Sequence, residues 1–180
     1  MGFAALADLK NQLNIPSSDT TNDTELTIYL NASNEVCEAL VGPSASTSFS
    51  ELYGADDGLL ILMHRPVIAI TSVTPTSGAV LASTAYTLDK DRNAVQINAG
   101  LPGQWTVVYT AGWTSIPARA QLAQVIIGQH LWETQRGGMV PSAFAPQEMV
   151  TLPGMGFAIP RRAAELLASL GSPATVPGIA

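Results

Sequence analysis

The chain has 180 residues, of which 47% are hydrophobic and 12% are charged, and its formal net charge is −6. The charged fraction is about half of the ~25% usual in soluble proteins. The chain is acidic, and its only adjacent basic residues are Arg161 and Arg162. This argues against binding to nucleic acid through the phosphates, because such binding needs clustered Lys and Arg. The length fits one domain, or one domain with appendages, and can bury a sizeable core.

Ser, Thr, Asn, Gly and Pro take the place of the missing charged residues. A surface with few charges fits a subunit that packs against neighbours, since a monomer relies on surface charge to stay soluble. The alternative is an ordinary surface rich in Ser and Thr. Composition alone leaves both interpretations open.

The first part of the chain predicts two helices. Leu6, Leu9 and Leu13 mark the first one. Asp23 is the expected N-cap of the second, which Gly42 and Pro43 end. Its apolar positions fall three or four apart: Leu26, Leu30, Ser33, Cys37 and Leu40. Cys37 is the only cysteine, so the chain forms no internal disulfide, and its place in this row predicts a small core residue.

The middle of the chain predicts short strands. A Ser-rich connector over residues 44–50 leads to expected strands at 59–63, 67–73, 85–88, 94–97 and 104–111. Residues 75–78 read as a turn and residues 89–93 as a hairpin loop. Such closely spaced strands favour antiparallel pairing, because parallel pairs need a long crossover.

A strand-to-helix junction follows. Trp105, Val107 and Tyr109 alternate with smaller residues, as in a half-buried strand, and Gly112 breaks it. Ser115 and Pro117 start a long helix that is apolar around most of its girth and is therefore expected to be central. The structural junction is expected to comprise Tyr109, Gly112, Trp113 and Trp132, with the two tryptophans largely buried between sheet and helix.

Residues 139–160 are apolar but carry several Pro and Gly, which prevent a regular helix. An apolar segment is a poor candidate for a free linker. It is either an arm that folds over its own sheet or, as we favour, an arm that lies on a neighbouring subunit. A short last helix begins at Arg161, where two basic side chains meet the positive end of the helix dipole.

Several segments, in this order, resemble the head-tail connector (adaptor) proteins of long-tailed bacteriophages. They are Leu6 to Asn14 with Ile15-Pro16, Asp19 and Asp23; Arg65 to Val73; Tyr86 to Asp89; Tyr109 to Trp113; Ile116-Pro117; Leu131 to Gly138; and Ile159-Pro160 with Leu166-Leu167. The set covers most of residues 5–170. The chain departs from the family after Leu167, where that family commonly has an aromatic residue and an arginine and this chain reads Ala168, Ser169, Leu170 and Gly171.

The resemblance implies an α+β fold: a helical bundle of two N-terminal helices, a long central helix and a short C-terminal helix, with a small antiparallel sheet inserted between the second and third helices. Residues 1–138 would form the adaptor core, and residues 139–180 an arm, a short docking helix and a flexible tail. It also implies a virion neck protein, present in the host cytoplasm during assembly. Copies would form a homo-oligomeric ring, expected to be a dodecamer, under the portal protein, and a stopper or tail-completion protein would attach to it.

DNA would pass through the lumen of that ring without specific binding, helped by the acidic charge of the chain. The residues expected to contact the portal or a neighbouring subunit are Arg161, Arg162, Leu166, Leu167, Leu170, Phe144, Met149, Leu152 and Phe157. The alternatives are another neck component, such as a stopper or a tail-terminator protein, or an enzyme whose site the sequence hides.

Catalytic patterns are absent from the sequence, so we expect no enzyme, no cofactor and no metal. His64 and His130 lie far apart and lack ligands at metal-binding spacing; His64 is expected in a turn and His130 in a helix. Asp56 and Asp57 precede Gly58 and favour turn chemistry. We also expect no signal peptide and no membrane span, because no apolar stretch is long enough.

Overall fold

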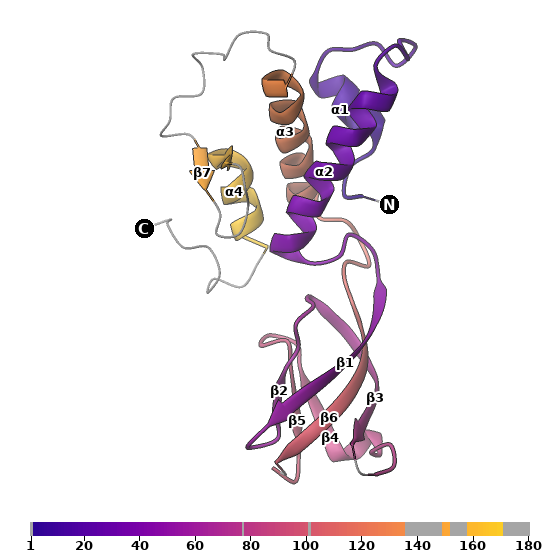
Figure 1. Cartoon of the computed structure of the whole chain (residues 1–180), viewed down its shortest axis with the longest axis vertical. Helices are drawn as coiled ribbons and strands as arrows, with labels where there is room; N and C mark the ends of the chain where they lie inside the picture. The colour runs from indigo at the N-terminus through magenta and orange to yellow at the C-terminus, as the bar shows by residue number, and fades with distance from the viewer. Residues whose placement is uncertain (1, 77, 101, 136–148, 152–157, 171–180) are drawn as a thin grey trace. The chain divides into compact units, whose positions relative to one another are not determined.

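A computed structural model describes residues 2–76, 78–100, 102–135, 149–151 and 158–170. The chain divides into two compact units (Figure 1). The helical unit is formed by Met1–Ser44 and Ser115–Ala180, and the β unit by Ala45–Thr114. Each unit has its own hydrophobic core.

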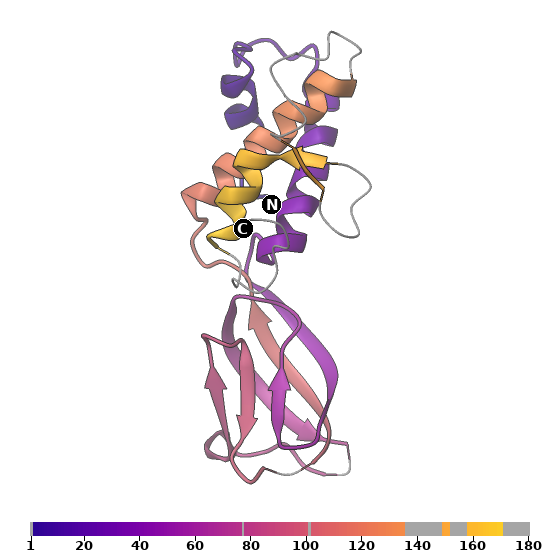
Figure 2. The same ribbon diagram turned by 90° about the vertical axis from the view of Figure 1, so that its left-hand side faces the viewer.

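The helical unit contains the α-helices of the described residues. These are α1 (Leu6–Gln12), α2 (Asp23–Val41), α3 (Ala118–Gln135) and α4 (Arg161–Ala168). Helix α3 packs against α1, α2 and α4, and Figure 2 shows α4 lying beside α3. The core between α1, α2 and α3 is built from Leu9, Leu26, Leu30 and Val125. Helix α3 is therefore central, as its apolar sequence predicts.

Small and polar side chains let α2 and α3 approach closely. A Cβ added at Gly128 of α3 would lie 3.3 Å from Leu9 Cδ1 and 3.5 Å from Ser33 Oγ. The buried side chain of Gln124 accepts a 2.6 Å hydrogen bond from the Ala4 N–H and donates a 2.9 Å bond to the Leu30 carbonyl. Gln124 thus ties the N-terminal segment, α2 and α3 together without leaving its amide unsatisfied.

The β unit consists of two three-stranded antiparallel sheets. The first has the order β1 (Thr47–Ala55), β6 (Gly103–Ala111), β3 (Val67–Pro75), and the second has the order β2 (Leu59–Ile61), β5 (Ala94–Ile97), β4 (Tyr86–Asp89). A short 3-10 helix, Ser83–Ala85, precedes β4. Trp105, Val107 and Tyr109 point into the core, as their alternation predicts, and meet Leu60, Val73, Val95 and Ile97.

The fold class is α+β, but two features of the expected arrangement are wrong. The strands form two sheets in a compact unit of their own, where a single small sheet inserted between the second and third helices was expected. The segment expected to be a Ser-rich connector contains β1, a nine-residue strand paired along its whole length with β6. Ser48 and Ser50 are exposed and alternate with half-buried Phe49 and Glu51. The exposed serines therefore made the segment resemble a loop, although the opposite face of the strand is partly buried.

Other sequence predictions concern the two ends of α2 and two turns of the β unit. Helix α2 begins at Asp23 with Asn22 as its N-cap, one residue earlier than expected, and Gly42 ends it with φ of 87°. Residues 89–93 form the loop of the β4–β5 hairpin, and the turn from Pro75 to Gly78 is closed by a 3.2 Å hydrogen bond. Both turns are confirmed.

Two short strands lie between α3 and α4 in the chain. They are β7 (Met149–Thr151) and β8 (Ala158–Pro160), which pair antiparallel. The sequence predicted only an irregular arm here. Within this segment the structure describes β7 and β8, two three-residue strands that the sequence did not predict.

Candidate functional site

The start of α4 presents the two arginines singled out in the sequence. Both side chains are exposed. Arg161 Nε donates a 2.9 Å hydrogen bond to Glu165 Oε1 one turn later, which forms an exposed ion pair. Within the described ranges, Arg162 has no ion pair. The adjacent arginines therefore differ: Arg161 is matched within its helix, and Arg162 is available to a carboxylate from outside.

The leucines of α4 also differ from one another. Leu167 is buried at 2% exposure, together with Ala163 and Ala164. Leu166 and Leu170 are half-buried. The expectation that all three leucines insert into a partner needs correction for Leu167, because its side chain already packs into the core of its own subunit.

An open groove lies beside the arginines. It has a volume of about 400 Å³ and is lined by Gln12, Ile126, Gln129, Pro160, Arg161, Arg162 and Glu165. The groove thus brings together α1, α3 and the start of α4. Gln12 Nε2 donates a 2.9 Å hydrogen bond to Gln129 Oε1 within it. The lining offers an apolar part at Ile126 and Pro160 and a basic part at Arg162.

The arm residues expected to contact a partner are Phe144, Met149, Leu152 and Phe157. Phe144, Leu152 and Phe157 lie outside the described residues. The backbone of Met149 belongs to β7 and pairs with Pro160, the residue that precedes α4. The β7–β8 pair therefore connects directly to the arginine-bearing end of α4.

The junction residues are distributed over both units. Tyr109 is fully buried in the β unit, Gly112 follows β6 with φ of +118°, and Trp113 is half-buried. Trp132 belongs to the helical unit, where it is half-buried and meets Tyr29 edge-on with ring centroids 6.0 Å apart. The two tryptophans thus belong to different units, and neither side chain is fully buried.

A polar cluster in the β unit was not foreseen. Tyr109 donates a 2.6 Å hydrogen bond to Glu51 Oε2, and Tyr53 donates to the same oxygen. His64 Nε2 lies 3.2 Å from Glu51 Oε1, and its ring stacks on Phe49 with centroids 3.8 Å apart. His64 lies in a bend between β2 and β3, as the sequence suggested. The alternation of Phe49, Glu51 and Tyr53 was the signal that could have revealed the cluster.

The electrostatics of this cluster indicate a structural role: its hydrogen bonds stabilise the charged form of Glu51. Burial raises the pKa of Glu51, but hydrogen bonds from Tyr109 and Tyr53 and the nearby His64 outweigh it, so the pKa lies below its ordinary value. Burial and then the bond to Glu51 raise the pKa of Tyr109. The arrangement favours an ionised Glu51 held by two neutral phenols.

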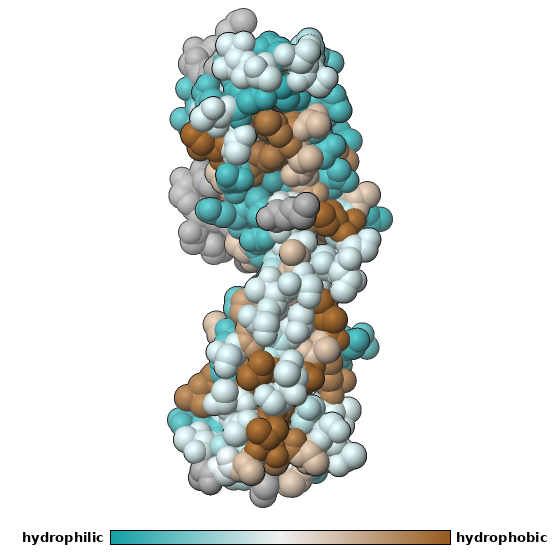
Figure 3. Space-filling model, turned by 90° about the vertical axis from the view of Figure 1, so that its right-hand side faces the viewer, coloured by the Kyte–Doolittle hydropathy of each residue, from teal (hydrophilic) through white to brown (hydrophobic). Residues whose placement is uncertain are grey.

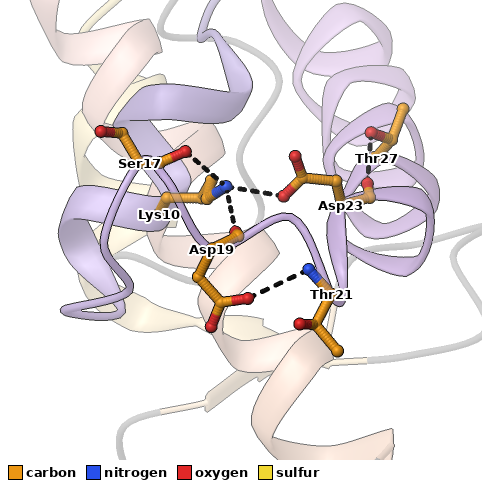
Figure 4. A network of polar contacts seen from close by, with 6 residues as sticks. All are labelled: Lys10, Ser17, Asp19, Thr21, Asp23 and Thr27. Atoms are coloured by element: carbon orange, nitrogen blue, oxygen red, sulfur yellow. Dashed lines mark hydrogen bonds and ion pairs between the residues drawn. The ribbon is translucent and has the colours of Figure 1, made fainter.

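The acidic loop before α2 is organised by one buried lysine (Figure 4). Lys10 is 4% exposed, and its ammonium donates to the carbonyls of Ser17 and Asp19 at 3.3 and 2.6 Å and to Asp23 Oδ1 at 2.7 Å. The backbone N–H of Thr21 and then its hydroxyl hold the pKa of Asp19 below its ordinary value. All three ammonium protons are used inside the chain, so Lys10 is a structural residue of this loop.

The other titratable groups singled out in the sequence have local roles. Burial, and next the Glu38 carboxylate, raises the pKa of the buried Cys37 to about 12, which keeps the thiol protonated. Burial lowers the pKa of His130. Asp57 Oδ1 accepts a 3.0 Å bond from the Leu59 N–H, which is turn chemistry as expected.

Two other kinds of site are absent from the part of the chain that the structure describes. Those residues contain no group of three or more His, Cys, Asp or Glu side chains placed to hold a metal ion. Their helices include none with the length and apolar character needed to cross a membrane.

Comparison with known proteins shows a shared fold. The chain resembles one in the neck of an empty gene transfer agent particle, computed with C6 symmetry, with a TM-score of 0.62 and 16% identity, over 96% of this chain and 91% of that one. A chain in the native gene transfer agent virion gives 0.63 and 17%, and one in the native neck computed with C12 symmetry gives 0.62 and 16%, with the same coverage. No protein-family model and no curated protein matches the sequence. The resemblance found in the sequence is thereby confirmed at the level of the fold.

Proposed function

We propose that the chain is a structural subunit of the neck of a tailed phage or phage-like particle, where it acts as the head-tail adaptor. The observation that carries this proposal is the fold shared along 96% of the chain with a chain of gene transfer agent particle necks. The order of adaptor-like segments in the sequence supports it independently. The low charged fraction fits a protein whose surface is largely covered by neighbours.

In this role, copies of the chain form a ring below the portal. The neck of the native gene transfer agent particle was computed with C12 symmetry, which supports a ring of twelve. A heterologous contact that closes on itself supplies such symmetry. The net charge of −6 suits a lumen through which DNA slides, because clustered basic residues would hold it. The subunit needs no catalytic chemistry for this work.

The arm and α4 form the docking device in this proposal. Leu166 and Leu170 are half-buried and retain surface for a partner, whereas Leu167 does not. Arg161 and Arg162 approach carboxylates of the portal or of an adjacent subunit. Met149, Phe144, Leu152 and Phe157 supply apolar contacts from the arm, and the boundary between core and arm lies near residue 138.

The test uses the full-length chain with an affinity tag, expressed together with the portal protein and the other neck proteins of the same particle. Copurification with portal in the absence of other neck proteins, and density for the subunit directly below the portal in electron micrographs of intact particles, are the expected results. A chain that binds only after another neck protein has bound portal is a stopper or a tail-terminator protein. Particles that contain no copy of the chain contradict both versions.

A further inference from the structure

The outer faces of α2 and α3 carry complementary chemistry on opposite sides of the helical unit. On α3, Gln124 and Gly128 face α2 and the core. Ile126 lies two residues after Gln124 and two before Gly128, which places it about 200° around the helix axis from both. It lines the groove described above. Leu122, one turn earlier on this outer face, is 38% exposed.

Helix α2 repeats this arrangement on the other side. Leu26 and Leu30 are buried, and Ile28 between them is 61% exposed. Glu35 is seven residues further on, so it lies on the same outer face about 10.5 Å along the axis, and it is exposed. This face therefore presents an apolar side chain and a carboxylate.

Charge is unevenly distributed over the same helices. Helix α2 contains Asp23, Glu25, Glu35 and Glu38 and no Lys or Arg. The exposed basic residues of the described helical unit are Arg119, Arg161 and Arg162, all of them on α3 or α4. Arg119 binds Ser169 at 3.0 Å and Arg161 binds Glu165 at 2.9 Å. Arg162 is thus the groove cation that a carboxylate of a second molecule can pair with.

We propose that the outer face of α2 from one copy of the chain packs into the groove between α1, α3 and α4 of the next copy. Ile28 contacts the apolar part of the groove, and Glu35 pairs with Arg162. The two surfaces differ and lie on opposite faces of the α2–α3 pair, so each copy uses both at once. The contact is heterologous, which is the type that closes into rings. The inference rests on the proposed function for its ring form, and it names the residues of the subunit contact.

The first experiment reverses the charges in the full-length chain. Self-association of the purified protein is measured by analytical ultracentrifugation for Arg162→Glu, for Glu35→Arg and for the double variant. Each single reversal is expected to raise the dissociation constant at least roughly tenfold, because it places like charges opposite each other. The double variant restores association. Arg92→Glu and Asp91→Arg, in the exposed β4–β5 loop, make the same charge changes and leave association unchanged.

The second experiment does not depend on affinity. Glu35→Cys and Arg162→Cys are combined in one chain and treated with a short bis-maleimide, since the Cα atoms of an Arg–Glu pair are too far apart for a direct disulfide. Cys37 is buried and protonated, so it need not be replaced. Because the two positions face opposite sides of the unit, the expected product is a ladder of covalent multimers, whereas either single cysteine stops at dimers.

Two results overturn the inference. The first is that both single charge reversals leave the dissociation constant of self-association unchanged. The second is that the double-cysteine chain, treated with the bis-maleimide either as assembled rings or as free protein, stays monomeric on denaturing gels at every concentration. Portal copurification is scored separately with the wild-type chain. Portal binding without a ladder of multimers supports the proposed function and contradicts this subunit contact. A ladder without portal binding supports the contact and contradicts the proposed function.

Discussion

Tyr109 on β6 and Glu51 on β1 are joined by a 2.6 Å hydrogen bond from the phenol to the carboxylate. Tyr109 pairs in register with Phe49, two residues before Glu51, so the bond runs diagonally across the strand pair. Tyr109 also accepts a 3.1 Å bond from the His64 N–H. One carboxylate therefore connects β1, β6 and the bend that leads into β3.

Replacing Glu51 by Gln tests how much these hydrogen bonds to the carboxylate stabilise the fold. The variant keeps the size of the side chain and removes the charge that two phenols and His64 surround. We expect the free energy of unfolding to fall by roughly 1.5 to 3 kcal/mol, the usual range for hydrogen bonds to a charged group. Denaturant unfolding measures the loss, and hydrogen exchange should place it in β1 and β6. Asp91→Asn, in an exposed loop, is the control; equal stabilities for Glu51→Gln and wild type would contradict the assignment.

The same carboxylate predicts a pH dependence. The pKa of Glu51 is lower in the folded state than in the unfolded chain, so the ionised form stabilises the fold. This contribution is complete above the unfolded pKa of about 4.3 and is lost as the pH falls through the lower folded value. The stability difference between wild type and Glu51→Gln should therefore shrink below about pH 4. Thermal melts at a series of pH values measure it, and a difference that grows in acid would refute the sign.

Lys10→Met tests the loop before α2. Methionine keeps the apolar stem but removes three hydrogen bonds, which leaves two carbonyls and Asp23 without their donor. Loss of one partner from a buried ion pair costs about 3 to 5 kcal/mol. The Asp23 side chain is 31% exposed and can recover water, so we expect about 2 kcal/mol. Faster hydrogen exchange confined to residues 13–23 would accompany the loss, and Lys90→Met, at an exposed position, should show neither effect.

Gly128 tests the close approach of α3 to α1 and α2. A leucine there has no space beside Leu9 and Ser33, and overpacking of this kind costs about 1 to 3 kcal/mol. Alanine should be much milder, since its Cβ contact of 3.3 Å is opposed by a gain in helix propensity of up to about 1 kcal/mol. Chemical denaturation of both variants measures the difference. A leucine variant as stable as the alanine variant would mean that the helices separate freely at this point.

Local sequence patterns determined most of the secondary structure. The end of α2 follows from Gly42, and the limits of the β4–β5 hairpin follow from its polar loop. Trp105, Val107 and Tyr109 face the core because a strand alternates its side chains. Each of these features depends on residues that are neighbours in the chain, which is why the sequence reveals them.

Contacts between distant residues were decided only by the tertiary structure. β1 is a strand because it pairs with β6, which lies far later in the chain, and its serines gave no local signal. The Glu51 cluster and the burial of Leu167 depend on the same kind of packing. The groove beside Arg162 takes residues from α1, α3 and α4. Periodicity assigns a residue to a face of its own helix or strand, and only the packing of that element determines what the face meets.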